Sequence, residues 1–199
     1  MFYHIQLNCI PRSGSHLLMS HILPRGYVEL PLDVSMYPRI NNYRGLSLIH
    51  NHVGDGIDLS RFKDDRKVVN VILKRNHFMS AISLIVTEYT GEYKSYSNKK
   101  FDKITVSPER VKEIIHANTR AIKVWKKFKH DRIARTVILD YDDLVNNRWT
   151  DVYNKLGIIH NPIHPGLNGL GTKIDIVRKS PNIPSQLVEN YKELKRQFK

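Results

Sequence analysis

The chain has a single cysteine, Cys9, and no long apolar run. We therefore expect no intramolecular disulfide and no cysteine-based zinc site. No apolar stretch approaches the roughly 20 residues that span a bilayer. A basic segment followed by an apolar core is also missing from the N-terminus, so neither a transmembrane segment nor a signal peptide is predicted. These absences favour a soluble cytoplasmic protein.

Acidic side chains are also scarce, because 19 Asp and Glu stand against 32 Lys and Arg, a formal net charge of +13. Such a charge favours anionic partners: a nucleotide, a sulfated or phosphorylated ligand, nucleic acid or an anionic membrane. Part of it lies on a predicted helix, at Lys123 to His130, and is expected to be solvated surface. The length suits one substantial α/β domain. Without repeats or a linker, residues 1–199 are predicted to form that single domain.

Strand-like and helix-like segments alternate along the chain. The predicted strands are Phe2–Ile10, Leu46–Ile49, Val68–Leu73 and Ile133–Leu139, the last two typical of strands covered on both faces. The predicted helices begin after Ser13 and then cover His77–Tyr89, Ser107–His130, Thr150–Leu156 and Ser185–Phe198. This alternation predicts a mostly parallel central sheet flanked by helices. The irregular stretches Pro24–Gly45 and Gly91–Thr105 are expected to wall an acceptor pocket.

The most informative segment is PRSGSHLL, from Pro11 to Leu18, between the first predicted strand and helix. A strand that turns into a helix through Ser-Gly directs several unpaired N–H groups, and the positive end of the helix dipole, at one point. Arg12 adds a positive charge beside that point. The pattern predicts a phosphate-binding loop, although the Walker spacing GxxxxGK[ST] and its lysine are missing. The alternative is an ordinary turn with Ser13 as the helix N-cap.

Further polar residues follow the other predicted strands, where parallel sheets bind ligands. In chain order, these residues are Arg12, Ser13, Gly14, Ser15 and His16, then His50, Asn51 and His52, then Arg75, and finally Asp140, Tyr141, Asp142 and Asp143. Two arginines, an aromatic side chain and a histidine should therefore converge at one edge. The three aspartates lack the Walker lysine that a magnesium site would need, so they are expected to form turns and helix caps.

These motifs resemble those of sulfotransferases that use 3′-phosphoadenosine 5′-phosphosulfate. PRSGSHLL resembles the 5′-phosphosulfate loop of that family. In VILKRNHFMSAISL, Arg75 and Ser83 lie eight residues apart, which resembles the 3′-phosphate motif. LDYDDLVNN resembles the stretch whose tyrosine contacts the adenosine, which corresponds to Tyr141 here. LIHNHV resembles the segment that carries the catalytic histidine, which corresponds to His52 here. The resemblance extends from about Phe2 to Gly157.

The chain departs from the family pattern at several positions. His16 and Leu17 replace a hydroxyl residue and an aromatic residue, and His50 stands where cytosolic members have a lysine. The second basic segment of the family is matched only by VRKSP, with Arg178 and Lys179 but without the glycine. Other branches use a glutamate base after the first helix. Glu29 is therefore the rival to His52 as the general base, and Asp33 is a weaker candidate than Glu29.

The resemblance implies a fold similar to that of P-loop NTPases and a sulfuryl transfer to a hydroxyl or amine of a small molecule or glycan. His52 would be the general base, Arg12 would assist catalysis, and no metal would be required. The residues expected to bind the donor are Arg12, Ser13, Gly14, Ser15, His16, Leu17, Arg75, Ser83, Tyr141, Arg178 and Lys179. One alternative is a P-loop-like nucleotide kinase with Asp140 or Asp142 on magnesium. The other is a non-catalytic basic module for nucleic acid, which would explain the charge but not the Arg75–Ser83 spacing. The oligomeric state is not predicted.

Overall fold

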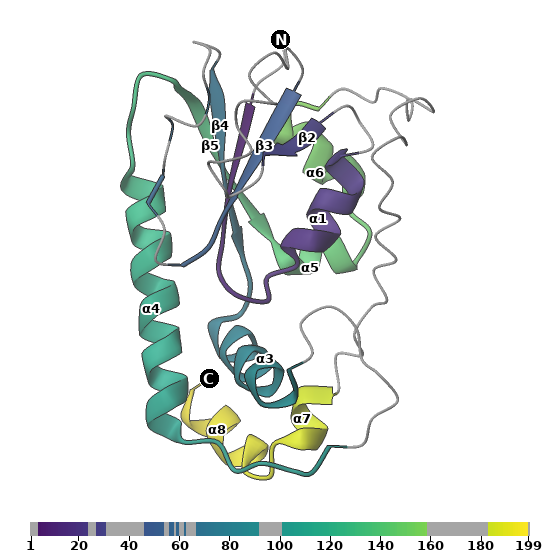
Figure 1. Ribbon diagram of the computed structural model, residues 1–199, viewed down its shortest axis with the longest axis vertical. Coiled ribbons are helices and arrows are strands. Elements are labelled where there is room, and N and C mark those ends of the chain that lie inside the picture. The colour runs from purple at the N-terminus through teal and green to yellow at the C-terminus, as the bar shows by residue number, and fades with distance from the viewer. Residues whose placement is uncertain are drawn as a thin grey trace.

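The computed structural model describes residues 4–23, 27–30, 46–53, 56–57, 59, 62, 67–91, 101–158 and 183–198. A five-stranded parallel sheet in the order β2-β3-β1-β4-β5 forms its centre (Figure 1). The strands are β1 (His4–Cys9), β2 (Tyr27–Leu30), β3 (Leu46–Asn51), β4 (Val68–Lys74) and β5 (Ile133–Asp140). The predicted α/β class with a parallel sheet is confirmed.

The strand order places a ligand crevice beside β1. After β1 the chain proceeds to β2 on one side of the sheet, whereas after β4 it proceeds to β5 on the other. Loops that leave neighbouring strands in opposite directions open a crevice at the carboxyl ends of those strands. Here that position is between the ends of β1 and β4, at Cys9 and Leu73, which are partners in the register.

Helices cover both faces of the sheet. On one face, α1 (Ser15–Ile22), α5 (Tyr141–Val145) and α6 (Trp149–Leu156) enclose a core with Ile5, Leu7 and Leu18. On the other face, α4 (Pro108–Lys127) buries Trp125 in a cluster with Ile10 and Ile72. Burial of these side chains is the main force that holds the layers together.

The remaining helices lie beyond the carboxyl edge of the sheet (Figure 1). They are α3 (His77–Thr90), α7 (Ile183–Leu187) and α8 (Tyr191–Gln197), which share a core with the first half of α4. Among the described residues, no helix is both long and apolar enough to cross a membrane.

Side-chain caps explain where α3 and α4 begin. Asn76 accepts from the backbone N–H of Met79 at 3.0 Å, and Ser107 accepts from that of Arg110 at 3.3 Å.

Several predicted elements need correction. A short strand, β2, lies inside the stretch expected to be irregular from Pro24 to Gly45, and residues 31–45 lie outside the described ranges. The strand β5, at the edge of the sheet, is covered on only one face, because its residues alternate between buried and exposed at its carboxyl end. Its residues Val137 and Leu139 are buried, but Ile138 is 37% exposed.

The C-terminal segment is not the single helix predicted for Ser185–Phe198. It divides into α7 and α8 because Val188 forms a parallel bridge with Ile104. Asn190 reinforces the break, since its side chain donates to the Val106 carbonyl at 2.8 Å and accepts from the Val106 N–H at 3.0 Å. A local amphipathic pattern is therefore interrupted by a tertiary contact.

Candidate functional site

The loop between β1 and α1 has an unusual backbone. Arg12 has φ of 59° and Gly14 has φ of 86°, both in the left-handed region. Such turns direct successive N–H groups toward one side and create concave anion sites. Gly14 is the N-cap of α1 and no side chain caps the helix, so the alternative that made Ser13 the N-cap is wrong. The first N–H groups of α1 consequently have no partner within the helix.

The Ser13 side chain is buried under this loop instead of capping the helix. It is 1% exposed, and within the described part of the chain its Oγ has no hydrogen-bond partner. A buried hydroxyl without a partner costs about 1–3 kcal/mol relative to a satisfied one. The loop therefore contains both a strained backbone and an unsatisfied polar atom.

Residues that follow β4 hold the loop in this conformation. Arg75 donates from Nη1 to the Arg12 carbonyl at 2.9 Å, and Ser80 donates from Oγ to the Pro11 carbonyl at 2.6 Å. The buried Asn118 of α4 donates to Ser80 Oγ at 3.2 Å. Ser80 was not among the predicted site residues. Its position one helical turn before Ser83 was the signal that could have found it.

Five of the predicted donor-binding residues meet at the loop. Arg12 donates from Nε to Ser83 Oγ at 3.4 Å, and Ser83 is buried in α3. The Arg75 guanidinium carbon lies 4.2 Å from the centre of the Tyr141 ring, a cation–π contact. The same ring lies against Gly14, where an added Cβ would be 2.8 Å from Cδ2. Segments following β1, β4 and β5 thus converge at the crevice.

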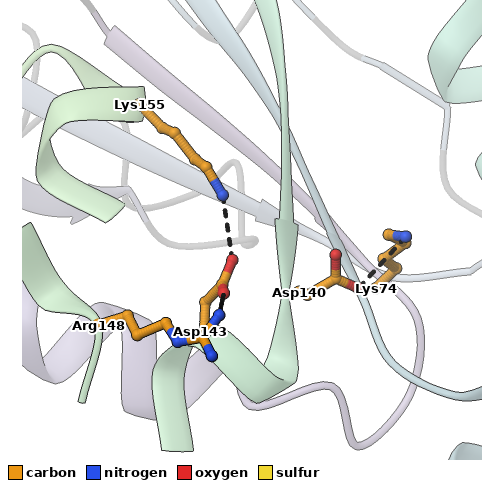
Figure 2. A network of polar contacts seen from close by, with 5 residues as sticks. All are labelled: Lys74, Asp140, Asp143, Arg148 and Lys155. Carbon is orange, nitrogen blue, oxygen red and sulfur yellow. Dashed lines mark hydrogen bonds and ion pairs between the residues drawn. The ribbon is translucent and has the colours of Figure 1, made fainter. Parts of the chain in front are cut away.

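Two of the three aspartates near this edge, Asp140 and Asp143, are engaged in ion pairs (Figure 2). Asp140 contacts Lys74 at 3.3 Å, while Asp143 contacts Lys155 at 3.1 Å and Arg148 at 3.5 Å. Asp140 occupies the N-cap position of α5, but its side chain makes no capping bond. The expectation that the aspartates form turns and helix caps is thus confirmed at Asp140 by its position, without a side-chain bond.

A second polar cluster lies beside the loop, at the ends of β1 and β3. His50 Nε2 is 2.9 Å from Cys9 Sγ, and His52 Nδ1 is 3.8 Å from the same sulfur. The His16 ring, from the first turn of α1, is centred 6.1 Å from that of His50. Burial, followed by the charges of His52 and His16, lowers the pKa of His50 to about 3. The His50 imidazole is therefore neutral at physiological pH, and His52 is the exposed member of the pair.

The other predicted residues lie at varied places. Ser15 is buried at the start of α1, and the partly buried Leu17 packs against the hydrophobic core beneath that helix. The backbone of Glu29 is in β2, opposite Leu48 of β3, and not in an irregular loop as predicted. Asp33, Arg178 and Lys179 are outside the described residues. The Cys9–His50–His52 cluster was missed, because only the strand order reveals that β3 is adjacent to β1.

Comparisons with protein-family models, with curated proteins and with solved structures found no match for this chain. Any function assigned to the crevice must therefore be argued from the residues themselves.

Proposed function

We propose that the protein is a sulfotransferase with a P-loop-like fold, which transfers a sulfuryl group from 3′-phosphoadenosine 5′-phosphosulfate to an acceptor hydroxyl or amine. The observation that carries the proposal is the contact of Arg12 with Ser83 at 3.4 Å, beside Arg75. Two guanidinium groups and a hydroxyl at one crevice suit a ligand with two separate anionic groups. The donor has this character, since it bears a 3′-phosphate and a 5′-phosphosulfate.

Each end of the donor has a candidate set of contacts. Arg12 and the N–H groups of the strained loop would bind the 5′ end, where a helix N-terminus and a positive charge favour anions. Arg75 and Ser83 would bind the 3′-phosphate. Tyr141, which lies between Gly14 and Arg75, is the candidate contact for the adenosine.

The chemistry requires mainly positioning and charge stabilisation. The acceptor oxygen or nitrogen forms a bond to sulfur, and the bond between sulfur and the 5′-phosphate oxygen breaks. The electron pair of that bond moves to the phosphate, so adenosine 3′,5′-bisphosphate leaves. Arg12 would stabilise the charge that grows on this oxygen, and the acceptor proton would pass to a base.

His52 is the proposed base. Imidazole is suited to proton transfer near neutral pH, and His52 is exposed where it follows β3. His50 is a poor alternative, because its burial and lowered pKa weaken it as a base. No metal is needed in this scheme. The kinase alternative would need Asp140 or Asp142 on magnesium, and the Asp140 carboxylate is paired with Lys74 at 3.3 Å.

The proposal is tested by nucleotide binding. Wild-type protein should bind adenosine 3′,5′-bisphosphate more tightly than ADP in calorimetric titration. Arg75→Ala should weaken bisphosphate binding by about 1.5–3 kcal/mol, the value of a charge-assisted contact. AMP binding should weaken far less, and only because Arg75 also supports the loop through the Arg12 carbonyl. Arg120→Ala is the matched control, since Arg120 is exposed on α4.

Two outcomes would contradict parts of the proposal. If wild-type protein prefers ADP, or binds neither nucleotide, the sulfotransferase assignment fails. If Arg75→Ala weakens bisphosphate and AMP equally, Arg75 does not contact the 3′-phosphate. A steep dependence of nucleic-acid binding on salt, without nucleotide preference, would instead favour the basic binding module.

A further inference from the structure

We propose that Cys9, His50 and His52 form a binding site for Zn²⁺ with one coordination position open to solvent. One ligand atom from each residue lies within 4.8 Å of the other two. The inference goes beyond the proposed sulfuryl transfer, which needs no metal. It also departs from the expectation, drawn from the single cysteine, that the chain has no cysteine-based zinc site.

The sheet itself brings the three ligands together. The strands β1 and β3 are parallel neighbours, and Leu7 and Asn8 pair with His50 and Asn51. Side chains alternate between the faces of a strand, so Cys9 lies on the same face as Leu7, and therefore as His50. The backbone of two neighbouring strands thus places Cys9 and His50, and His52 follows directly after the end of β3 at Asn51.

The distances agree with a single bound ion. Zinc–sulfur and zinc–nitrogen bonds of about 2.3 and 2.0–2.1 Å, at tetrahedral angles, place sulfur and nitrogen about 3.6 Å apart. The observed separations from Cys9 Sγ are 2.9 Å to His50 Nε2 and 3.8 Å to His52 Nδ1. The two separations differ from that spacing by about 0.7 and 0.2 Å, which changes in side-chain torsion would have to supply on binding.

The ligand chemistry favours zinc over magnesium or calcium. A thiolate and two imidazoles are borderline-soft ligands, whereas Mg²⁺ and Ca²⁺ prefer oxygen. On binding, the Cys9 thiol releases its proton to solvent, and the imidazoles coordinate in their neutral forms. Cys9 donates to the Asn51 carbonyl at 3.3 Å, and this bond would be replaced by the bond to zinc.

Burial indicates the kind of site. Cys9 is 1% and His50 5% exposed, but His52 is exposed to solvent. An ion held by these three residues would be open on the His52 side. Three protein ligands with a water in the fourth position are typical of exchangeable or catalytic zinc sites, while structural sites are closed by four protein ligands.

Metal binding would affect the proposed transferase reaction. A zinc ion on Nδ1 of His52 leaves the proton on Nε2, so His52 could not accept a proton from the acceptor. Zinc should then inhibit sulfuryl transfer if His52 is the base. The site itself can be tested without nucleotide, so a failure of the metal site and a failure of the transferase proposal are distinguishable.

The experiment is a titration of the metal-stripped full-length protein with Co²⁺, followed by absorption. We expect one equivalent to bind, with tetrahedral visible bands and a thiolate-to-cobalt charge-transfer band that Zn²⁺ then abolishes. Because Cys9 is the sole cysteine, that band can report only on Cys9. Cys9→Ser should remove it. His50→Gln and His52→Gln should each weaken cobalt binding by at least about tenfold.

His116→Gln is the matched control, because His116 is exposed on α4, and it should bind cobalt as the wild type does. Thermal unfolding provides a second readout if the Cys9 or His50 variant folds poorly. Zn²⁺ should raise the Tm of the wild type and of His116→Gln but not that of His52→Gln. The proposal is overturned if the wild type gives no charge-transfer band, or if His52→Gln retains full cobalt affinity and the same zinc-induced rise in Tm.

Discussion

At the scale of single residues, the most informative feature is the strain around Arg12. A non-glycine residue in the left-handed region costs of the order of 1–3 kcal/mol and persists only where neighbours enforce it. The neighbours here are Arg75 and Ser80, which bind the carbonyls of Arg12 and Pro11. The Ser13 hydroxyl is left buried in the same loop, without a hydrogen-bond partner among the described residues. A loop that its neighbours hold in one conformation supports the proposal of a preorganised anion site.

The choice of base is also decided at this scale. If His52 accepts the proton, His52→Ala should lower turnover by roughly a hundred- to ten-thousandfold, with nucleotide affinity nearly unchanged. The measurement is sulfuryl transfer from the nucleotide donor, in the presence of a chelator so that bound metal does not interfere. Glu29→Gln is assayed beside it. Retained activity in His52→Ala together with loss in Glu29→Gln would assign the base to Glu29.

At the scale of elements, the turn from β1 into α1 depends on contact with the start of α5. Gly14→Ala would place a Cβ 2.8 Å from the Tyr141 ring and would also strain the backbone at φ of 86°. Gly91→Ala is the control, because Gly91 has φ of 68° but no atom near its Cβ position. Both variants should lose about 1–2 kcal/mol of unfolding free energy from the left-handed backbone. Only Gly14→Ala should also weaken binding of adenosine 3′,5′-bisphosphate, as measured by calorimetry.

Equal nucleotide affinities in the two glycine variants would show that the Gly14–Tyr141 contact does not shape the site.

Two short elements, β2 and α5, were not predicted from the local pattern of the sequence. The strand β2 is only four residues long, and α5 only five, so neither has enough residues for a clear periodicity. Both are stabilised by neighbours: β2 by pairing with β3, and α5 by Leu144 in the core.

At the scale of the whole molecule, the burial of Tyr27 in the sheet core makes the free energy of unfolding depend on pH in the alkaline range. Burial raises the pKa of Tyr27 from 10.0 to about 12, partly offset by Arg135. The phenol ionises at lower pH in the unfolded chain than in the folded protein. The neutral buried phenol therefore stabilises the folded protein fully below pH 10.0. This stabilisation is lost as the pH rises through about 12.

Tyr27→Phe should remove this dependence. Between pH 10.0 and about 12, the wild type should lose roughly 2–3 kcal/mol more unfolding free energy than Tyr27→Phe does. Denaturant unfolding at several pH values measures the difference, and the lysines that titrate in the same range cancel between the two proteins. Tyr89→Phe, at a side chain that is 47% exposed, should behave as the wild type. Parallel pH curves for wild type and Tyr27→Phe would refute the assignment.

The sequence by itself determined the features that depend on neighbours along the chain. Alternating apolar runs, a capping serine and a helix-starting proline specify β1, β3, β4 and α4, because hydrogen bonding and burial at these elements follow local periodicity. The turn at Gly14 and the positive charges of Arg12 and Arg75 could be predicted from the local sequence for the same reason. The rule that ligands bind at the carboxyl ends of parallel strands was enough to predict that the two arginines face the same edge of the sheet.

Only the tertiary structure decided which strand ends are adjacent. The order β2-β3-β1-β4-β5 brings Cys9 beside His50 and Arg12 beside Ser83, across 41 and 71 residues of sequence. It also leaves β5 at the edge and divides the C-terminal helix at Val188. Strand order and tertiary breaks arise from the packing of distant apolar faces, and no local pattern encodes which of those faces will meet.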